Sequence, residues 1–234
     1  MQKGPDDELM PMIDLANVAC GFHGGDPVTM HKTIKLAKKY NVPVGAHPSL
    51  PDREGFGRRY IDISPADLYD QLVYQIGALV GMLRAEGMEL NHVKTHGYLY
   101  RFTQASEEHC EAVIRAIKLF NVPCVQVAGS RQEKMAAKFG VPFIPEFYPD
   151  LHYDTAGGLV PLLTSSRVPI DTIKEKVEKL INQDIVLTQE NEPVRIGLEG
   201  RSFSCCIHSD LPSKSRNGQS IAQSPKLTQA GQTL

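Results

Sequence analysis

The chain has 234 residues, of which 41% are hydrophobic and 22% charged, and its formal net charge at pH 7 is −2. This composition is typical of a globular protein, and a net charge so close to zero provides no overall basic field for nucleic acid or anionic lipid. The N-terminal segment MQKGPDDELMPM lacks the apolar core of a signal peptide, and no stretch reaches the roughly 18 apolar residues of a membrane helix. We therefore expect a soluble cytoplasmic protein whose partner is a small molecule or another protein.

The cysteines do not form a recognisable framework. No CxxC pair and no zinc-finger spacing occurs in the sequence, which favours free thiols in a reducing compartment. The five positions are Cys20, Cys110, Cys124, Cys205 and Cys206.

Short apolar runs alternate with longer amphipathic ones along the chain. In chain order, the patterns predict strand 13–20, helix 27–40, strand 42–46, helix 65–87 with Ser64 as its N-cap, strand 90–94, helix 106–120, strand 123–128, helix 131–139, strand 141–147 and helix 169–183, followed by strand candidates at 194–200 and 202–208. Regular alternation of strands and helices predicts a parallel sheet covered by helices, either a barrel or a doubly wound sheet. The polar tail, residues 213–234, is rich in Ser and Gln and is predicted to be disordered.

Half of the eight histidines lie at or shortly after the C-terminal ends of predicted strands. Because the carboxyl ends of parallel strands meet on one face of an α/β fold, these side chains are candidates for a shared site. A single histidine after a strand is more often a hydrogen-bonded loop residue, so the repetition carries the prediction. The four are His23, His47, His96 and His208.

Cationic side chains accompany the histidines. Lys94 lies two residues before His96, so both can point to the same side of the strand end, and this combination suits an anionic or carbonyl-bearing substrate. Arg58 and Arg59 follow the turn sequence GFG; a guanidinium binds carboxylate or phosphate in a bidentate way, although two solvated surface charges are an equally good interpretation.

Carboxylates follow the strand predicted at 141–147. Glu146 and Asp150 can provide a general base or metal ligands, and His with carboxylate suits zinc, iron or manganese. No HExxH or HxH spacing occurs, so the metal hypothesis has little local support and no metal is assigned. The segment GFHGGDP can direct backbone N–H groups toward a phosphate, but it is not a P-loop.

Several long motifs in a fixed order resemble those of the LamB/YcsF family. The matching segments are 6–27, 42–59 (VPVGAHPSLPDREGFGRR), 75–79, 92–100 (HVKTHGYLY), 145–161 and 207–212. The resemblance implies an α/β fold, namely an irregular or incomplete β/α barrel of the glycoside hydrolase/deacetylase type. It also implies an activity as the A subunit of 5-oxoprolinase: opening of the lactam of 5-oxo-L-proline to L-glutamate, driven by hydrolysis of ATP with Mg and assisted by two further subunits.

The resemblance, together with the positions above, assigns roles to particular residues. The expected catalytic residues are His23, His47, Lys94, His96 and Glu146. The expected substrate- or anion-binding residues are Asp26, Arg58, Arg59, Tyr100, Asp150, His208 and Asp210.

The chain departs from the family pattern at several places, among them Leu151 and Leu162, where the family usually has arginine, and HSDLPSK in place of HGDTPGA. Its sequence begins after the usual first strand with a DLNCDxGE-like motif, so the expected domain is a barrel over residues 1–212 without that strand, and the usual KPHGALYN is KTHGYLYR. Two alternatives therefore stay open: a metal-dependent hydrolase or deacetylase of carbohydrate metabolism, and an inactive truncated paralogue or interaction protein.

Overall fold

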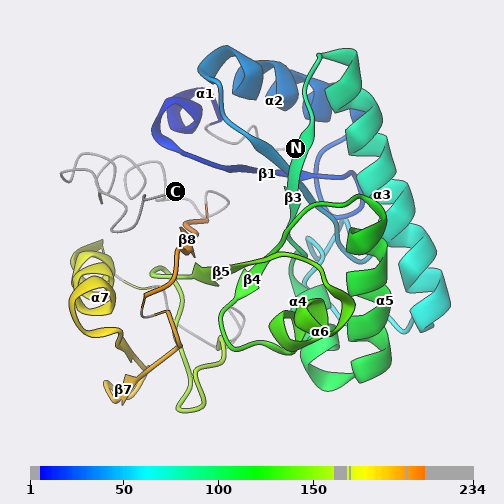
Figure 1. The fold of residues 1–234 in the computed structure, drawn as a ribbon. Helices are drawn as coiled ribbons and strands as arrows, with labels where there is room; N and C mark the ends of the chain where they lie inside the picture. Colours follow the sequence, from blue (N-terminus) through cyan, green and yellow to red (C-terminus); the bar gives the residue numbers. More distant parts are fainter. Residues whose placement is uncertain (1–5, 161–167, 169, 199, 209–234) are drawn as a thin grey trace. The chain divides into compact units, whose positions relative to one another are not determined.

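The computed structural model describes residues 6–160, 168, 170–198 and 200–208 (Figure 1). The chain divides into two compact units. The larger unit comprises Ile13–Gln126 and Arg131–Phe143, and the smaller unit comprises Met1–Met12, Val127–Ser130 and Ile144–Leu234. The tail predicted at 213–234 lies outside the described residues, and a single domain over residues 1–212 stays a prediction.

Parallel strands form the centre of the larger unit. They are β1 (Ala16–Ala19), β2 (Val44–His47), β3 (Leu90–Val93) and most of β4 (Cys124–Val127), and they neighbour one another in this order. The register places Val18 beside Ala46, Ala46 beside Val93 and Val93 beside Cys124. All four residues of β4 are buried, as expected for a strand covered on both faces. The predicted parallel sheet is thus present in this unit.

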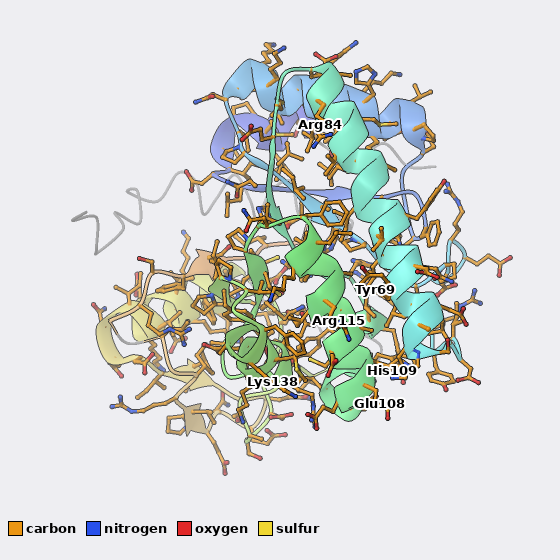
Figure 2. The ribbon with its side chains drawn as sticks, turned by 45° about the vertical axis from the view of Figure 1, so that its right-hand side comes forward. Tyr69, Arg84, Glu108, His109, Arg115 and Lys138 are labelled. Carbon is orange, nitrogen blue, oxygen red and sulfur yellow. The ribbon has the colours of Figure 1, made fainter. Side chains whose placement is uncertain are left out.

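Helices follow the strands and pack against one another. They are α2 (Pro27–Tyr40), α3 (Pro65–Ala85), α4 (Tyr98–Ala105), α5 (Glu107–Leu119) and α6 (Arg131–Phe139). Helix α3 contacts α2 and α5, and α5 contacts α4 and α6 (Figure 1). Arg84 on α3, Glu108 and Arg115 on α5 and Lys138 on α6 are exposed on the outer faces (Figure 2).

Helix α3 is the longest element, and its sequence explains where it lies. Apolar residues recur at helical spacing, and Leu68, Leu72, Ile76, Leu79 and Leu83 are at most 1% exposed. Burying each such side chain contributes about 2 kcal/mol. The helix begins where predicted, because the Ser64 hydroxyl accepts a hydrogen bond from the backbone N–H of Asp67 and Pro65 occupies the first turn.

Helix α4 is not predicted from the sequence pattern. It begins directly after Gly97, whose φ is +60°, and its sequence YLYRFTQA is rich in aromatic residues of modest helix propensity. A Cβ atom at Gly97 would overlap the carbonyl oxygen of Gly57, which accepts a hydrogen bond from the Tyr98 N–H at 2.8 Å. Tertiary packing on α5 and α6 therefore stabilises this helix.

The smaller unit has shorter strands. Its elements are α1 (Asp6–Leu9), the 3-10 helix η1 (Met10–Met12), most of β5 (Phe143–Phe147), α7 (Ile170–Gln183), β6 (Val186–Leu187), β7 (Pro193–Val194) and β8 (Ser204–Cys205). Strands β5 and β8 are parallel, with Glu146 beside Ser204, whereas β6 and β7 are antiparallel. The strand candidate at 202–208 thus shrinks to Ser204–Cys205. The candidate at 194–200 overlaps β7 only at Val194, and residues 195–198 and 200 are not in a strand, so that prediction was wrong. Across the described part of the chain, no helix is long and apolar enough to cross a membrane.

Candidate functional site

Three of the predicted histidines lie together in the larger unit. His23 follows β1, His47 ends β2 and His96 follows β3. The rings of His23 and His96 stack with centroids 3.8 Å apart and an interplanar angle of 9°, and the His47 ring meets that of His96 edge-on at 4.8 Å. The parallel order of the strands thus gathers residues that are up to 73 positions apart, counted from 23 to 96.

Hydrogen bonds link His47 and His96 into a chain. His47 Nδ1 donates to the carbonyl oxygen of Lys94 at 2.7 Å, and His96 Nε2 donates to the carbonyl oxygen of Phe56 at 2.8 Å. The other two ring nitrogens, His47 Nε2 and His96 Nδ1, are 3.0 Å apart. Directly hydrogen-bonded imidazoles are suited to moving a proton.

His23 is held by residues that sequence reasoning missed. Its Nδ1 lies 2.8 Å from the Ser49 hydroxyl, which donates to the Leu50 carbonyl oxygen at 2.9 Å and so accepts from the ring. The side chain of Gln75 binds Ser49 twice, accepting from its N–H at 3.0 Å and donating to its carbonyl oxygen at 2.9 Å. The available signal was Gln75 itself, a polar residue on the buried stripe of α3, three positions after Leu72.

Burial and neighbouring positive charge disfavour protonation of these rings. Burial lowers the pKa of His23 to about 2, with further contributions from His96, Arg58 and Arg53. The pKa of His47 is also well below its usual range, again through burial first and then through His96 and Lys94. A positively charged environment of this kind attracts an anion.

The loop after β2 contains the two predicted arginines, Arg58 and Arg59, which contact different neighbours. The buried Asp52 carboxylate accepts hydrogen bonds from the Arg59 side-chain Nε at 2.9 Å and from the Gly55 N–H at 2.8 Å, and these bonds lower the pKa of Asp52 to about 2. Arg58 instead lies over the Phe56 ring at 5.2 Å and contributes to the field at His23. Arg59 thus braces the loop, whereas Arg58 acts on the histidines.

The remaining predicted residues of the larger unit have different surroundings. Asp26 caps α2, because its carboxylate accepts the Thr29 N–H and the Thr29 hydroxyl, both at 2.9 Å. Lys94 is 3% exposed and contributes to the field at His47, so the predicted cation lies beside the histidine cluster. Tyr100 is half-buried in the first turn of α4. The predicted roles of Asp26 and Tyr100 as ligand-binding residues stay predictions.

A second group of predicted residues lies in the smaller unit. Glu146 is 1% exposed and accepts a hydrogen bond from the Ser204 hydroxyl at 3.1 Å. Asp150 accepts the backbone N–H of His208 at 2.9 Å, and its carboxylate lies 3.1 Å from the His208 Nδ1. Asp210 lies outside the described residues.

Lys176 joins the smaller group and was not predicted. It is 2% exposed, donates to the Leu151 carbonyl oxygen at 2.8 Å, and has a pKa lowered to about 8 by burial, against the opposing attraction of Asp150. A lysine on the buried face of α7, three positions after Ile173, was the signal in the sequence. Over the part of the chain that the structure describes, no group of three or more His, Cys, Asp or Glu is arranged to hold a metal ion.

Ionisable side chains that follow successive parallel strands of an α/β fold are typical of α/β enzymes. The chain belongs to the LamB/YcsF family, whose sequence model matches residues 1–233. It is 41% identical over 211 residues to the lactam utilization protein lamB of Emericella nidulans, covering 89% of this chain and 82% of that protein. It is also 41% identical over 213 residues to the A subunit of 5-oxoprolinase from Pyrococcus furiosus, with the same coverage.

A solved structure supports the same assignment. The crystal structure of the lactam utilization protein from Thermus thermophilus matches with a TM-score of 0.84 and 34% identity, covering 94% of this chain and 88% of that one. The predicted fold class, an α/β fold of the incomplete β/α barrel type, is thereby confirmed. The relatives named as 5-oxoprolinase subunits place the chain in a hydrolase-type enzyme family whose members are parts of multi-subunit complexes.

Proposed function

We propose that this chain is the A-type component of an ATP-dependent 5-oxoprolinase, which opens the lactam of 5-oxo-L-proline to L-glutamate in the cytoplasm together with partner subunits. The observation that carries the proposal is the hydrogen-bonded His47–His96 pair, set among cationic side chains. Family membership and the names of the relatives support the substrate class.

The reaction needs an activated carbonyl and a protonated leaving nitrogen. Transfer of the terminal phosphoryl group of ATP, bound with Mg, to the lactam oxygen would make the carbon electrophilic. One water then adds to that carbon, and the ring C–N bond breaks as the nitrogen takes a proton, leaving an acyl phosphate. A second water hydrolyses the acyl phosphate to L-glutamate and inorganic phosphate.

The residues of the larger unit suit the proton and charge requirements of these steps. The His47–His96 pair can take a proton from the attacking water and return one to the ring nitrogen. Lys94 and Arg58 provide positive charge for the carboxylate and phosphoryl group of the substrate. We assign His23 to orienting the His96 ring, against which it stacks.

The residues of the smaller unit provide a second set of candidates. Glu146 is buried and Asp150 pairs with His208, so either carboxylate can act as a base once substrate and partner subunits are bound. We propose these roles for the assembled enzyme.

Turnover of 5-oxo-L-proline in the presence of ATP, Mg and the partner subunits tests the proposal. His47→Gln and His96→Gln should each lower kcat by about 10²–10⁴-fold, the usual range for a lost acid-base group. The matched control is His31→Gln, because His31 on α2 lies at the protein surface and binds Glu86. Unchanged rates in both cluster variants would remove the pair from the reaction, and an inactive wild-type complex would contradict the proposed function.

A further inference from the structure

The hydrogen-bond chain through His47 and His96 requires a definite number of protons. Backbone carbonyl oxygens can only accept, so His47 Nδ1 and His96 Nε2 must each carry a hydrogen. The two inner nitrogens face each other at 3.0 Å, and one of them must donate to the other. Neutral imidazoles carry one hydrogen each, whereas these contacts need one at each end and one in the middle. The hydrogen-bond chain is therefore complete only when the His47–His96 pair holds one extra proton and thus one positive charge.

Changing a tautomer does not remove this requirement. If His96 moves its hydrogen from Nε2 to Nδ1, the inner contact is satisfied, but the Nε2 lone pair then faces the Phe56 oxygen at 2.8 Å. The equivalent change in His47 places a lone pair against the Lys94 oxygen at 2.7 Å. Either neutral arrangement leaves two acceptors in contact in a mostly buried place, which is unfavourable.

The charged surroundings oppose the proton that the geometry needs. The positive charges near the rings are that of Lys94 after β3, which acts on His47, and those of Arg58 and Arg53 in the loop after β2, which act on His23. The neighbouring His23 is itself neutral, because its pKa is lowered to about 2. The Cys20 thiol, which interacts with the His47 backbone, stays neutral because burial raises its pKa to about 12. Asp52 in the same loop is bound to Arg59.

A negative charge from a ligand resolves this conflict. We propose that the larger unit binds an anionic oxyacid group, a carboxylate or a phosphoryl group, together with one proton that completes the His47–His96 pair. The anion offsets the positive charge of Lys94 and Arg58, and the pair then becomes an imidazole–imidazolium donor. The choice of ligands rests on the proposed function, because 5-oxo-L-proline carries a carboxylate and its activated form a phosphoryl group, but the coupling of proton and anion does not.

Isothermal titration of the full chain measures this coupling directly. The probes are 5-oxo-L-proline and sodium sulfate at pH 7.5, both fully ionised there, in several buffers that differ in ionisation enthalpy. The dependence of the observed heat on that enthalpy gives the protons taken up, and we expect about one per anion bound. Affinity should accordingly fall by up to about tenfold for each pH unit of increase.

The two probes distinguish the sources of the anionic group. Proton uptake on binding of 5-oxo-L-proline but not of sulfate identifies a carboxylate site. Proton uptake on binding of sulfate but not of 5-oxo-L-proline identifies a phosphoryl site. Saturable binding of both without proton uptake overturns the proposal, and so does the absence of binding by either.

A variant and a spectroscopic measurement locate the proton. His47→Gln should lower the uptake to near zero, whereas the surface control His31→Gln should retain it, with folding checked by thermal unfolding. If His47→Gln does not fold, the protonation of the pair can be measured from the ¹⁵N chemical shifts of wild-type protein labelled at its histidines. One ring of the pair should be protonated on both nitrogens when the anion is bound. Two neutral rings in the bound state contradict the proposal.

The test of proton-coupled anion binding can fail or succeed independently of the test of the proposed 5-oxoprolinase reaction. Proton uptake without lactam turnover in the assembled enzyme leaves the coupling standing and overturns the proposed reaction. Turnover without proton uptake leaves the reaction standing and overturns the coupling.

Discussion

Gly57 lies where the loop after β2 approaches the histidine rings, and this close approach makes Gly57→Ala a sensitive test of the site. Its φ is +68°, in the left-handed region. A Cβ atom built there would lie 2.9 Å from the Cβ of His23 and from the Cδ2 of His96, and 3.2 Å from the Cβ of Ser49. Contacts this close with inner side-chain atoms force either the loop or the rings to move.

The expected loss of stability has two parts. A non-glycine residue in the left-handed region costs about 1–2 kcal/mol, and overpacking a buried site costs about 1–3 kcal/mol. The free energy of unfolding of Gly57→Ala, from urea denaturation at pH 7, should therefore be lower than that of the wild type by about 2–5 kcal/mol. Activity of the assembled enzyme should fall as well, because the rings are displaced.

The matched control is Gly77→Ala on the exposed side of α3. Beyond the adjacent residues and the backbone of the helix itself, no heavy atom lies within 4 Å of the Cβ position at Gly77, and alanine favours a helix over glycine by about 0.5–1 kcal/mol. This variant should be slightly more stable than the wild type. A loss below about 1 kcal/mol for Gly57→Ala would refute the close packing between the loop and the histidines.

Three further predictions concern buried charge. Asp52→Asn should lower the free energy of unfolding at pH 7 by about 1–2 kcal/mol, because the asparagine binds Arg59 more weakly. The pKa of Asp52 is lowered to about 2, so the stability difference between variant and wild type should shrink as the pH falls from about 4 to 2. An equal difference at pH 2 would contradict the role of the ionised carboxylate. The pKa of His23 is lowered to about 2, so below pH 6.5 this ring takes up a proton only in the unfolded chain. The free energy of unfolding of the wild type, measured by urea denaturation, should therefore fall by about 1–2 kcal/mol between pH 6.5 and 5, and His23→Gln should remove this contribution to the pH dependence. Lys176 has a pKa lowered to about 8, so stability should rise with pH between 8 and 10.5, and thermal unfolding of Lys176→Met over that interval should show a flatter rise.

The sequence predicted those elements whose ends are chemically marked. Helix α2 spans the predicted residues 27–40 because Pro27 follows a capping aspartate, and the predicted bounds of α6 are also confirmed. The helix α4 escaped prediction because its aromatic sequence has no strong helix preference, and packing on α5 and α6 overrides that weakness. Strands β1 to β5 were located, most of them predicted too long, because apolar runs continue beyond the hydrogen-bonded residues. The two-residue strand β6 was not predicted.

Part of the site followed from the sequence for a similar reason. The end of a parallel strand can be recognised locally, so the proximity of His23, His47 and His96 could be expected from topology. The different surroundings of Arg58 and Arg59 could not, because they depend on the path of a loop fixed by Asp52. Ring orientations and proton positions also depend on tertiary contacts that no local pattern encodes.

The two bonds between Gln75 and Ser49 connect the long helix α3 to the histidine cluster. The Ser49 hydroxyl accepts a hydrogen bond from His23 Nδ1, and the Ser49 backbone is hydrogen-bonded to the side chain of Gln75 in the middle of α3. A shift of that helix along its axis would therefore draw the serine, and with it the imidazole, away from its present position. Residues of α3 that do not contact the rings thus still determine where His23 lies.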